Sequence, residues 1–301
     1  MTITEELMAA NPAFNRLEQD ARSGYAAFRD GTTPAAPQGP TAYTQQAYPQ
    51  QSYGQPGAPV GQDHLEHMYN APSATPVQAG RVTMDDVIMK TLGLFAIVLA
   101  FGAAGWFAAA TNPGLGFMLW MGGMIGTLIL GLVIAFKKTL SVPLILGYAA
   151  LEGLFVGAVS QFFETMYGGI VAQAVLATLA TFAGMFAAYK FGLIKVTDKF
   201  RRIVTMMIFG YAIFAVVNFI FAMVTNTAFG FGGSGTVGIL ISLFAVGLAS
   251  VSLALDFDSV DRAIATGAPQ KYSWLLAHGI IVTLVWLYIE FLRLIARLRS
   301  E

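Results

Sequence analysis

From Thr91 to Thr111 the chain reads TLGLFAIVLAFGAAGWFAAAT, without a single charged residue. A hydrocarbon core of about 30 Å needs about 20 apolar residues in one helix. The stretch lacks the period-two alternation of a membrane β-strand, and inside a bilayer every backbone group must be paired within the structure. We therefore predict that this stretch is a transmembrane α-helix.

Further segments of the same kind follow, and the breaks between them carry turn or charge signals such as Asn112-Pro113-Gly114, Lys137-Lys138 and the glycine-rich run Phe229–Gly235. The predicted spans cover residues 91–111, 114–136, 142–163, 169–191, 202–224, 236–258 and 273–296. The fold class predicted is an all-α, polytopic membrane bundle of about seven transmembrane helices within residues 84–299. Small residues, as in Gly102–Gly105 and Gly122-Gly123, should let helix backbones approach closely.

The composition agrees with a membrane protein, because 56% of the 301 residues are apolar and only 11% are charged. Basic and acidic residues balance at 17 each, so no net field indicates a nucleic-acid partner. The absence of cysteine excludes disulfides, thiolate metal sites and thiol nucleophiles. The first 25 residues hold no apolar run of a signal peptide, and we expect no bound cofactor.

Residues 1–80 differ from the rest of the chain and are rich in Pro, Gln, Gly and Tyr, as in YTQQAYPQQSYGQPGAPVGQ at 43–62. Such a segment buries too little apolar surface to offset the entropy of ordering it, so we predict a disordered tail. A solvated tether is the simpler interpretation, and weak self-association is the alternative. The sequence does not indicate the partners of the tail.

Basic residues gather in alternate loops: Lys137 and Lys138, then four residues between Lys195 and Arg202, then Arg262 and Lys271. The loops at 112–113, 164–169 and 225–235 carry no Lys or Arg. By the positive-inside rule the basic loops and the N-terminus face the cytoplasm, which predicts a multi-pass protein of the cell membrane. One feature conflicts with this, since the predicted outer C-terminus carries Arg293, Arg297 and Arg299.

Ionisable residues within the predicted spans are the candidate functional groups, because a charge at membrane depth costs about 3 kcal/mol on insertion scales. They are Glu152, Asp256, Asp258, His278, Glu290 and Arg293. Structural explanations stand beside the functional one. The two aspartates could be a solvated helix end, Glu290 and Arg293 could neutralise each other at i,i+3, His278 could be a packed histidine, and Glu152 a buried protonated acid.

The functional interpretation joins these acids. Two carboxylates in a low-dielectric interior cannot both ionise easily, so they share a proton near neutral pH. A protonated pair holds two helices together, whereas an ionised pair repels itself and attracts a hard divalent cation through oxygen ligands. This chemistry predicts a proton-sensitive gate for a cation.

Two stretches, LFAVGLASVSLALDFDSVDRA and LVWLYIEFLRLIARLR, resemble the last two helices of the Bax inhibitor 1-like (transmembrane Bax inhibitor motif) family, bacterial type. The matching positions are Phe257-Asp258 and the run Leu287–Phe291, and ALEGLFVGAVS at 150–160 resembles the third helix of the family. The resemblance covers about 84–299. It implies a pH-sensitive, calcium-permeable leak channel, not an enzyme, gated by a carboxylate pair between helices six and seven.

Carried over by the resemblance, the gating pair is Asp258 and Glu290, with possible cation contact at both; Asp256, Glu152, His278 and Arg293 are second-tier candidates. The second acid is Glu here, one methylene longer than the Asp of the family pattern. In a simple hairpin about Gly267–Pro269, the residue level with Asp258 would be near His278. The pair therefore requires much of 259–277 to be loop or interfacial helix.

Other functions remain open. A proton-coupled transporter would use the same acids as a relay, and a non-enzymatic membrane scaffold or regulator would act through the tail. An intramembrane serine protease would use Ser234 of the string Gly232–Gly235 together with His278. The charge pattern places those two residues at opposite faces of the membrane, and the Gly-x-Gly-Asp string of an aspartyl intramembrane protease is absent.

Overall fold

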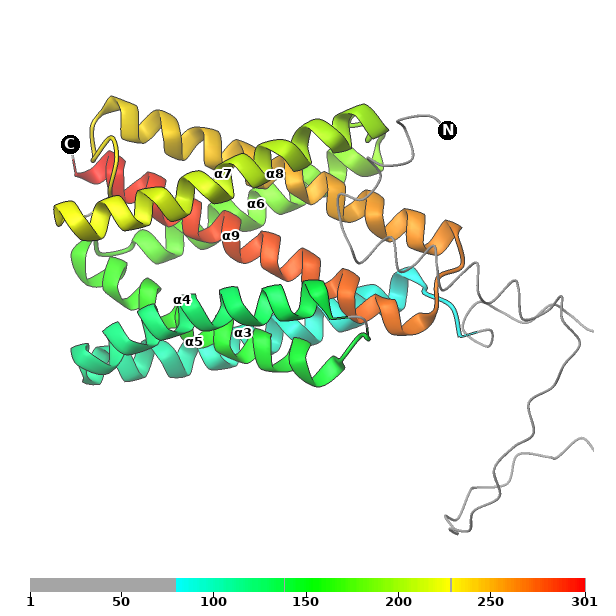
Figure 1. The fold of residues 1–301 in the computed structure, drawn as a ribbon, viewed down its shortest axis with the longest axis horizontal. Helices are drawn as coiled ribbons and strands as arrows, with labels where there is room; N and C mark the ends of the chain where they lie inside the picture. The colour runs from blue at the N-terminus through cyan, green and yellow to red at the C-terminus, as the bar shows by residue number, and fades with distance from the viewer. Residues whose placement is uncertain (1–79, 138, 228, 301) are drawn as a thin grey trace, which may run out of the picture.

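A computed structural model describes residues 80–137, 139–227 and 229–300. Seven helices in this part of the chain are long and apolar enough to cross a membrane. With the labels of Figure 1 they are α3 (Met84–Thr111), α4 (Pro113–Phe136), α5 (Val142–Met166), α6 (Ile170–Lys190), α7 (Asp198–Thr225), α8 (Thr236–Ala265) and α9 (Ser273–Arg299). The predicted seven-helix membrane bundle is confirmed. The predicted tail lies almost wholly outside the described residues.

Polar residues at the helix ends set the boundaries. Asn112 closes α3 and its side chain accepts hydrogen bonds from the backbone N–H groups of Gly114 and Leu115, with Pro113 as the first residue of α4. Thr83 and Thr197 cap α3 and α7 in the same way. These side chains satisfy donors that a helix leaves unpaired in its first turn. Turn signals in the sequence thus correspond to residues that cap the helices of the bundle.

Helix α8 continues beyond the predicted end at Asp258 and reaches Ala265. Only residues 266–269 and a short 3₁₀ turn, Gln270–Tyr272, separate it from α9. The direct pair required much of 259–277 to be loop or interfacial helix, but 259–265 continue α8 and 273–277 already belong to α9. The alternating charges from Asp256 to Arg262 are compatible with the helix because Arg262 neutralises Asp258 one turn away.

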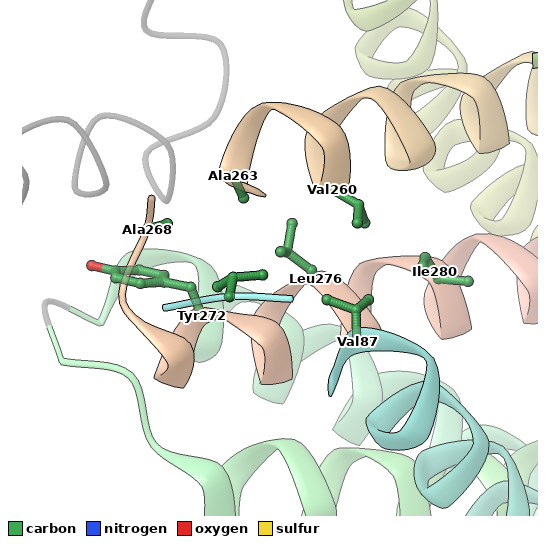
Figure 2. Packing of buried hydrophobic residues seen from close by; sticks show 8 residues of the cluster. Val87, Val260, Ala263, Ala268, Tyr272, Leu276 and Ile280 are labelled. Carbon is green, nitrogen blue, oxygen red and sulfur yellow. The ribbon is translucent and has the colours of Figure 1, made fainter. Parts of the chain in front are cut away.

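The segment before α3 holds the α8–α9 turn in place. The backbone N–H of Val82 donates to the carbonyl of Ala268 at 2.8 Å, and the N–H of Gln270 donates to Gly80 at 2.7 Å. Figure 2 shows Val87, Val260, Leu276 and their neighbours meeting from α3, α8 and α9 next to this contact. The backbone pairing and the apolar cluster together fix the register of α8 against α9.

Glycines allow α3 and α5 to pack backbone against backbone. A Cβ atom on Gly157 would clash with the carbonyl oxygen of Gly102, and one on Gly105 would clash with that of Leu154. Gly123 of α4 meets Phe155 in the same manner, whereas Gly122 has open space. The predicted close approach through small residues is thus found at Gly102, Gly105 and Gly123.

Helix α9 is the centre of the bundle. Figure 1 shows it running between α3–α5 on one side and α6–α8 on the other. Buried residues face all around it, among them Ala277, Ile281, Leu287 and Leu292. By contrast, α7 lies at the periphery and exposes most of its apolar residues. Side chains of α9 therefore meet those of both halves of the bundle.

Candidate functional site: buried acids around the central helix

Glu152 of α5 lies in the interior beside α9. It is 4% exposed, and the hydroxyl of Tyr148, one turn earlier, donates to its Oε1 atom at 3.1 Å. Its Oε2 atom is buried without a hydrogen-bond partner. The ring of Tyr148 packs edge-on against His278 of α9, with centroids 4.5 Å apart. A hydrogen bond within α5 and an aromatic ring contact to α9 thus place these three residues next to one another.

Asp256 of α8 approaches α9 from the other side. A Cβ atom on Gly279 would lie 3.8 Å from its Oδ1 atom, and Thr283 interacts with the same carboxyl. The Oδ2 atom is buried and has no hydrogen-bond partner. Since His278 and Gly279 are consecutive, the polar groups of α5 and of α8 meet α9 at the same level. We call Tyr148, Glu152, Asp256, His278 and Thr283 the central polar cluster.

Glu290 lies further along α9 and faces α7. Its Oε1 atom accepts hydrogen bonds from the hydroxyl of Tyr211 at 2.6 Å and from Nε1 of Trp286 at 3.2 Å. Nη1 of Arg293 lies 3.2 Å from both carboxylate oxygens. The i,i+3 ion pair expected from the sequence is therefore present, and Tyr211 extends it to α7.

Asp258 faces α7 nearer the α8–α9 turn. Its Oδ2 atom pairs with Nη2 of Arg201 and with Nε of Arg262, the latter at 2.9 Å. Arg262 also reaches Asp198 at 3.3 Å. Asp258 is thus a member of an ion-pair group between α7 and α8, and its charge is balanced by two arginines.

The structure does not bring Asp258 and Glu290 into contact. Each has its own partners, and no hydrogen bond or ion pair among the described residues joins the two. Asp256 is level with Gly279 and Thr283, and Glu290 lies 7 residues beyond Thr283, which is about 10 Å along a helix. The direct pair fails because the α8–α9 linker is short. The functional role of either acid remains a prediction.

Several residues of these groups escaped the sequence reasoning: Tyr148, Arg201, Tyr211 and Thr283. A signal for Tyr148 existed, since it precedes Glu152 by four residues and must share its helix face. No local signal places Arg201 beside Asp258 or Tyr211 beside Glu290, because those contacts join helices through tertiary packing.

The arginines near the C-terminus find protein acceptors. Arg297 is 1% exposed and donates to Ser242 at 2.8 Å and to the carbonyl of Phe229 at 3.1 Å, and it also reaches the carbonyl of Gly238. Arg299 donates to the carbonyls of Tyr167 and Gly168. These contacts hold α9 against the start of α8 and the neighbouring loops. They give Arg297 and Arg299 a structural role that does not depend on the side of the membrane they face.

Neither a metal cluster nor the proposed serine–histidine pair is found in the part of the chain described. No three His, Cys, Asp or Glu side chains there gather in a way that could hold a metal ion. Ser234 precedes α8, and the 30 residues of that helix span about 45 Å before the turn next to His278. The two residues therefore lie at opposite ends of the bundle.

Seven apolar helices with acids buried around a central helix define a multi-pass membrane protein that holds a polar cluster in its apolar interior. A family model described as Bax inhibitor 1 like matches residues 11–300, so the chain belongs to this family. The match begins well before the motifs at 150–160, 243–263 and 284–299 and includes most of residues 1–80. No curated protein matches the chain.

Proposed function

We propose that this protein is a passive, proton-sensitive leak for calcium or another small cation in the cell membrane, with a cytoplasmic N-terminus. The observation that carries the proposal is the central polar cluster. Glu152 and Asp256 each keep one buried oxygen without a hydrogen-bond partner. Burying an unpaired polar group in an apolar interior costs roughly 2–7 kcal/mol of free energy. In this proposal the free oxygens are the atoms that contact the cation.

The chemistry of the cluster supports cation passage. Carboxylate oxygens are the ligands that hard divalent cations prefer, and the free oxygens of Glu152 and Asp256 are available for a transient contact. When protonated, the same groups carry no charge and attract no cation. Proton binding then closes the path and proton release opens it, which makes the flux rise with pH.

Asp258 and Glu290 contribute in a different way in this proposal. Both acids hold α7, Asp258 through Arg201 and Glu290 through Tyr211. Protonation of either carboxylate weakens a charge-assisted contact to that helix. They remain the predicted sensor residues, acting on the position of α7 and not by direct pairing.

Calcium flux into proteoliposomes, measured between pH 6 and 8, tests the proposal. Glu152→Gln and Asp256→Asn should each lower the flux and flatten its pH dependence, whereas Asp258→Asn and Glu290→Gln should shift the pH of half-maximal flux. Asp261→Asn is the matched control, since this residue bonds Tyr189 at the exposed end of α8. Profiles identical to wild type in all four variants would refute the role of the acids.

A proton-coupled transporter is the second candidate, because the hydroxyl of Tyr148 bonds Glu152 and the ring of Tyr148 packs on His278, which places three ionisable groups close together. A coupled transporter moves protons with each turnover. A proton gradient imposed without a calcium gradient would then drive calcium accumulation against its own gradient. A leak only equilibrates calcium under those conditions, so this measurement separates the two functions.

A further inference from the structure

An apolar groove lies between α7 and α8, with a volume of about 520 Å³. Ligand pockets in proteins typically measure about 300–1,000 Å³. Its walls include Met207, Gly210, Tyr211 and Phe214 of α7 and Leu240 and Phe244 of α8. Tyr211 is the only one of these six with a polar group, and its hydroxyl is engaged by Glu290. The groove therefore presents a ligand with an apolar surface on which no side-chain polar group of these six residues is free.

The groove belongs to a surface that a bilayer covers. Helices α7 and α8 cross one another in Figure 1, and residues that line the groove are exposed and apolar, including Met207, Leu240 and Phe244. Both helices are of membrane-spanning length and hydropathy. The medium around this face is hydrocarbon, so acyl chains and not water are in contact with the groove.

A positive charge stands on the same face of α7. Lys199 precedes Gly210 by 11 residues, which is about 16 Å along a helix and three turns, so the two residues share one side. The spacing equals about half of a 30 Å hydrocarbon core, the depth that one leaflet provides. Lys199 and the neighbouring Arg202 are both exposed. A lipid with its headgroup at Lys199 can reach the groove with its chain.

We propose that the α7–α8 groove binds one anionic phospholipid, with its phosphate at Lys199 and Arg202 and one acyl chain against Gly210 and Tyr211. Tyr211 also holds Glu290 and stacks on Trp286, with ring centroids 5.7 Å apart. The bound chain therefore touches the residue that connects α7 to the central helix. This inference concerns lipid binding and does not depend on cation transport.

Trp286 reports occupancy of the groove. The variant in which Trp106, Trp120 and Trp274 are replaced by Phe keeps Trp286 as its single tryptophan. It is reconstituted in phosphatidylcholine with rising fractions of phosphatidylglycerol that carries bromine atoms in mid-chain. A specific site gives quenching that saturates at a low fraction, before the bulk lipid around the protein is replaced.

Two substitutions locate the site. Gly210→Leu fills the groove, because a Cβ atom there meets nothing within 4 Å, and it should remove the saturating phase. Gly184→Leu, on the exposed face of α6 and equally free of neighbours, is the matched control and should leave it unchanged. Lys199→Gln should raise the half-saturating fraction about fivefold, as expected for one basic residue near a lipid headgroup.

Three outcomes would overturn the proposal. Quenching that rises in proportion to the brominated fraction shows bulk contact alone. A saturating phase retained in Gly210→Leu places the lipid elsewhere. Loss of the saturating phase together with a change of oligomeric state in Gly210→Leu shows that a second copy of the chain fills the groove. Thermal unfolding of each variant confirms that the protein is folded.

Discussion

The hydroxyl of Tyr211 on α7 donates a 2.6 Å hydrogen bond to Glu290 on α9. This contact crosses from the most peripheral helix to the central one. Asp258 of α8 contacts the same helix through Arg201. Arg201 precedes Tyr211 by ten residues, which is about 15 Å along α7. At the other end, Asn218 bonds the backbone of Phe229 and Phe231. Polar contacts at three levels thus fasten a helix whose apolar residues mostly face lipid.

Tyr211→Phe should loosen α7 while leaving its packing surface intact. The buried carboxylate of Glu290 loses its shortest hydrogen bond, which should cost about 1–3 kcal/mol of unfolding free energy. Hydrogen exchange followed by mass spectrometry should show faster exchange in α7 peptides. Tyr288→Phe removes a comparable buried hydroxyl, bonded to Ser160 at 2.6 Å, and should not affect α7. Equal α7 exchange in the two variants would contradict the assignment.

Gly157→Ala should destabilise the contact between α3 and α5. The added methyl group meets the carbonyl of Gly102, and overpacking of this kind costs about 1–3 kcal/mol. Gly147→Ala on the same helix has open space and should be neutral or stabilising by up to about 1 kcal/mol. Unfolding in mixed micelles measures both. A smaller loss for Gly157→Ala than for Gly147→Ala would show that the helices are not in backbone contact.

Arg297→Met should weaken the junction between α9 and the start of α8. The side chain is buried, and its loss removes three hydrogen bonds from a charged donor, to the Phe229 and Gly238 carbonyls and to Ser242, so we expect a cost of about 2–3 kcal/mol. Arg299→Met affects only exposed contacts and should cost less than about 1 kcal/mol. The reverse order in a micelle unfolding titration would argue that Arg297 acts elsewhere.

Single cysteines should reveal the orientation, because the chain contains none of its own. With a membrane-impermeant maleimide, we expect Ser234→Cys and Ser300→Cys to react on intact cells. Lys195→Cys should react only after permeabilisation. If Ser300→Cys behaves like Lys195→Cys, α9 does not cross the membrane and the basic C-terminus follows the positive-inside rule.

The sequence predicted the seven spans closely because each is a long apolar run, a local property that the bilayer itself selects. It failed at the end of α8, where the predicted span stops at Asp258 and Asp261 follows. The helix continues there because Arg201, Arg262 and Tyr189 supply partners for these acids. Two of those three partners come from other helices, so hydropathy and local spacing could not predict their contacts with Asp258 and Asp261.

The same distinction between local signals and tertiary contacts applies to the candidate site. The sequence alone determined which residues are ionisable at membrane depth, since Glu152, Asp256, His278 and Glu290 stand out in any apolar run. Only the tertiary structure decided which of them meet. The short turn at 266–272, held by the segment around Val82, sets the register of α8 on α9. That register puts Asp256 beside Gly279 and directs Asp258 and Glu290 separately toward α7, because helices of fixed rise cannot bring residues at different depths together.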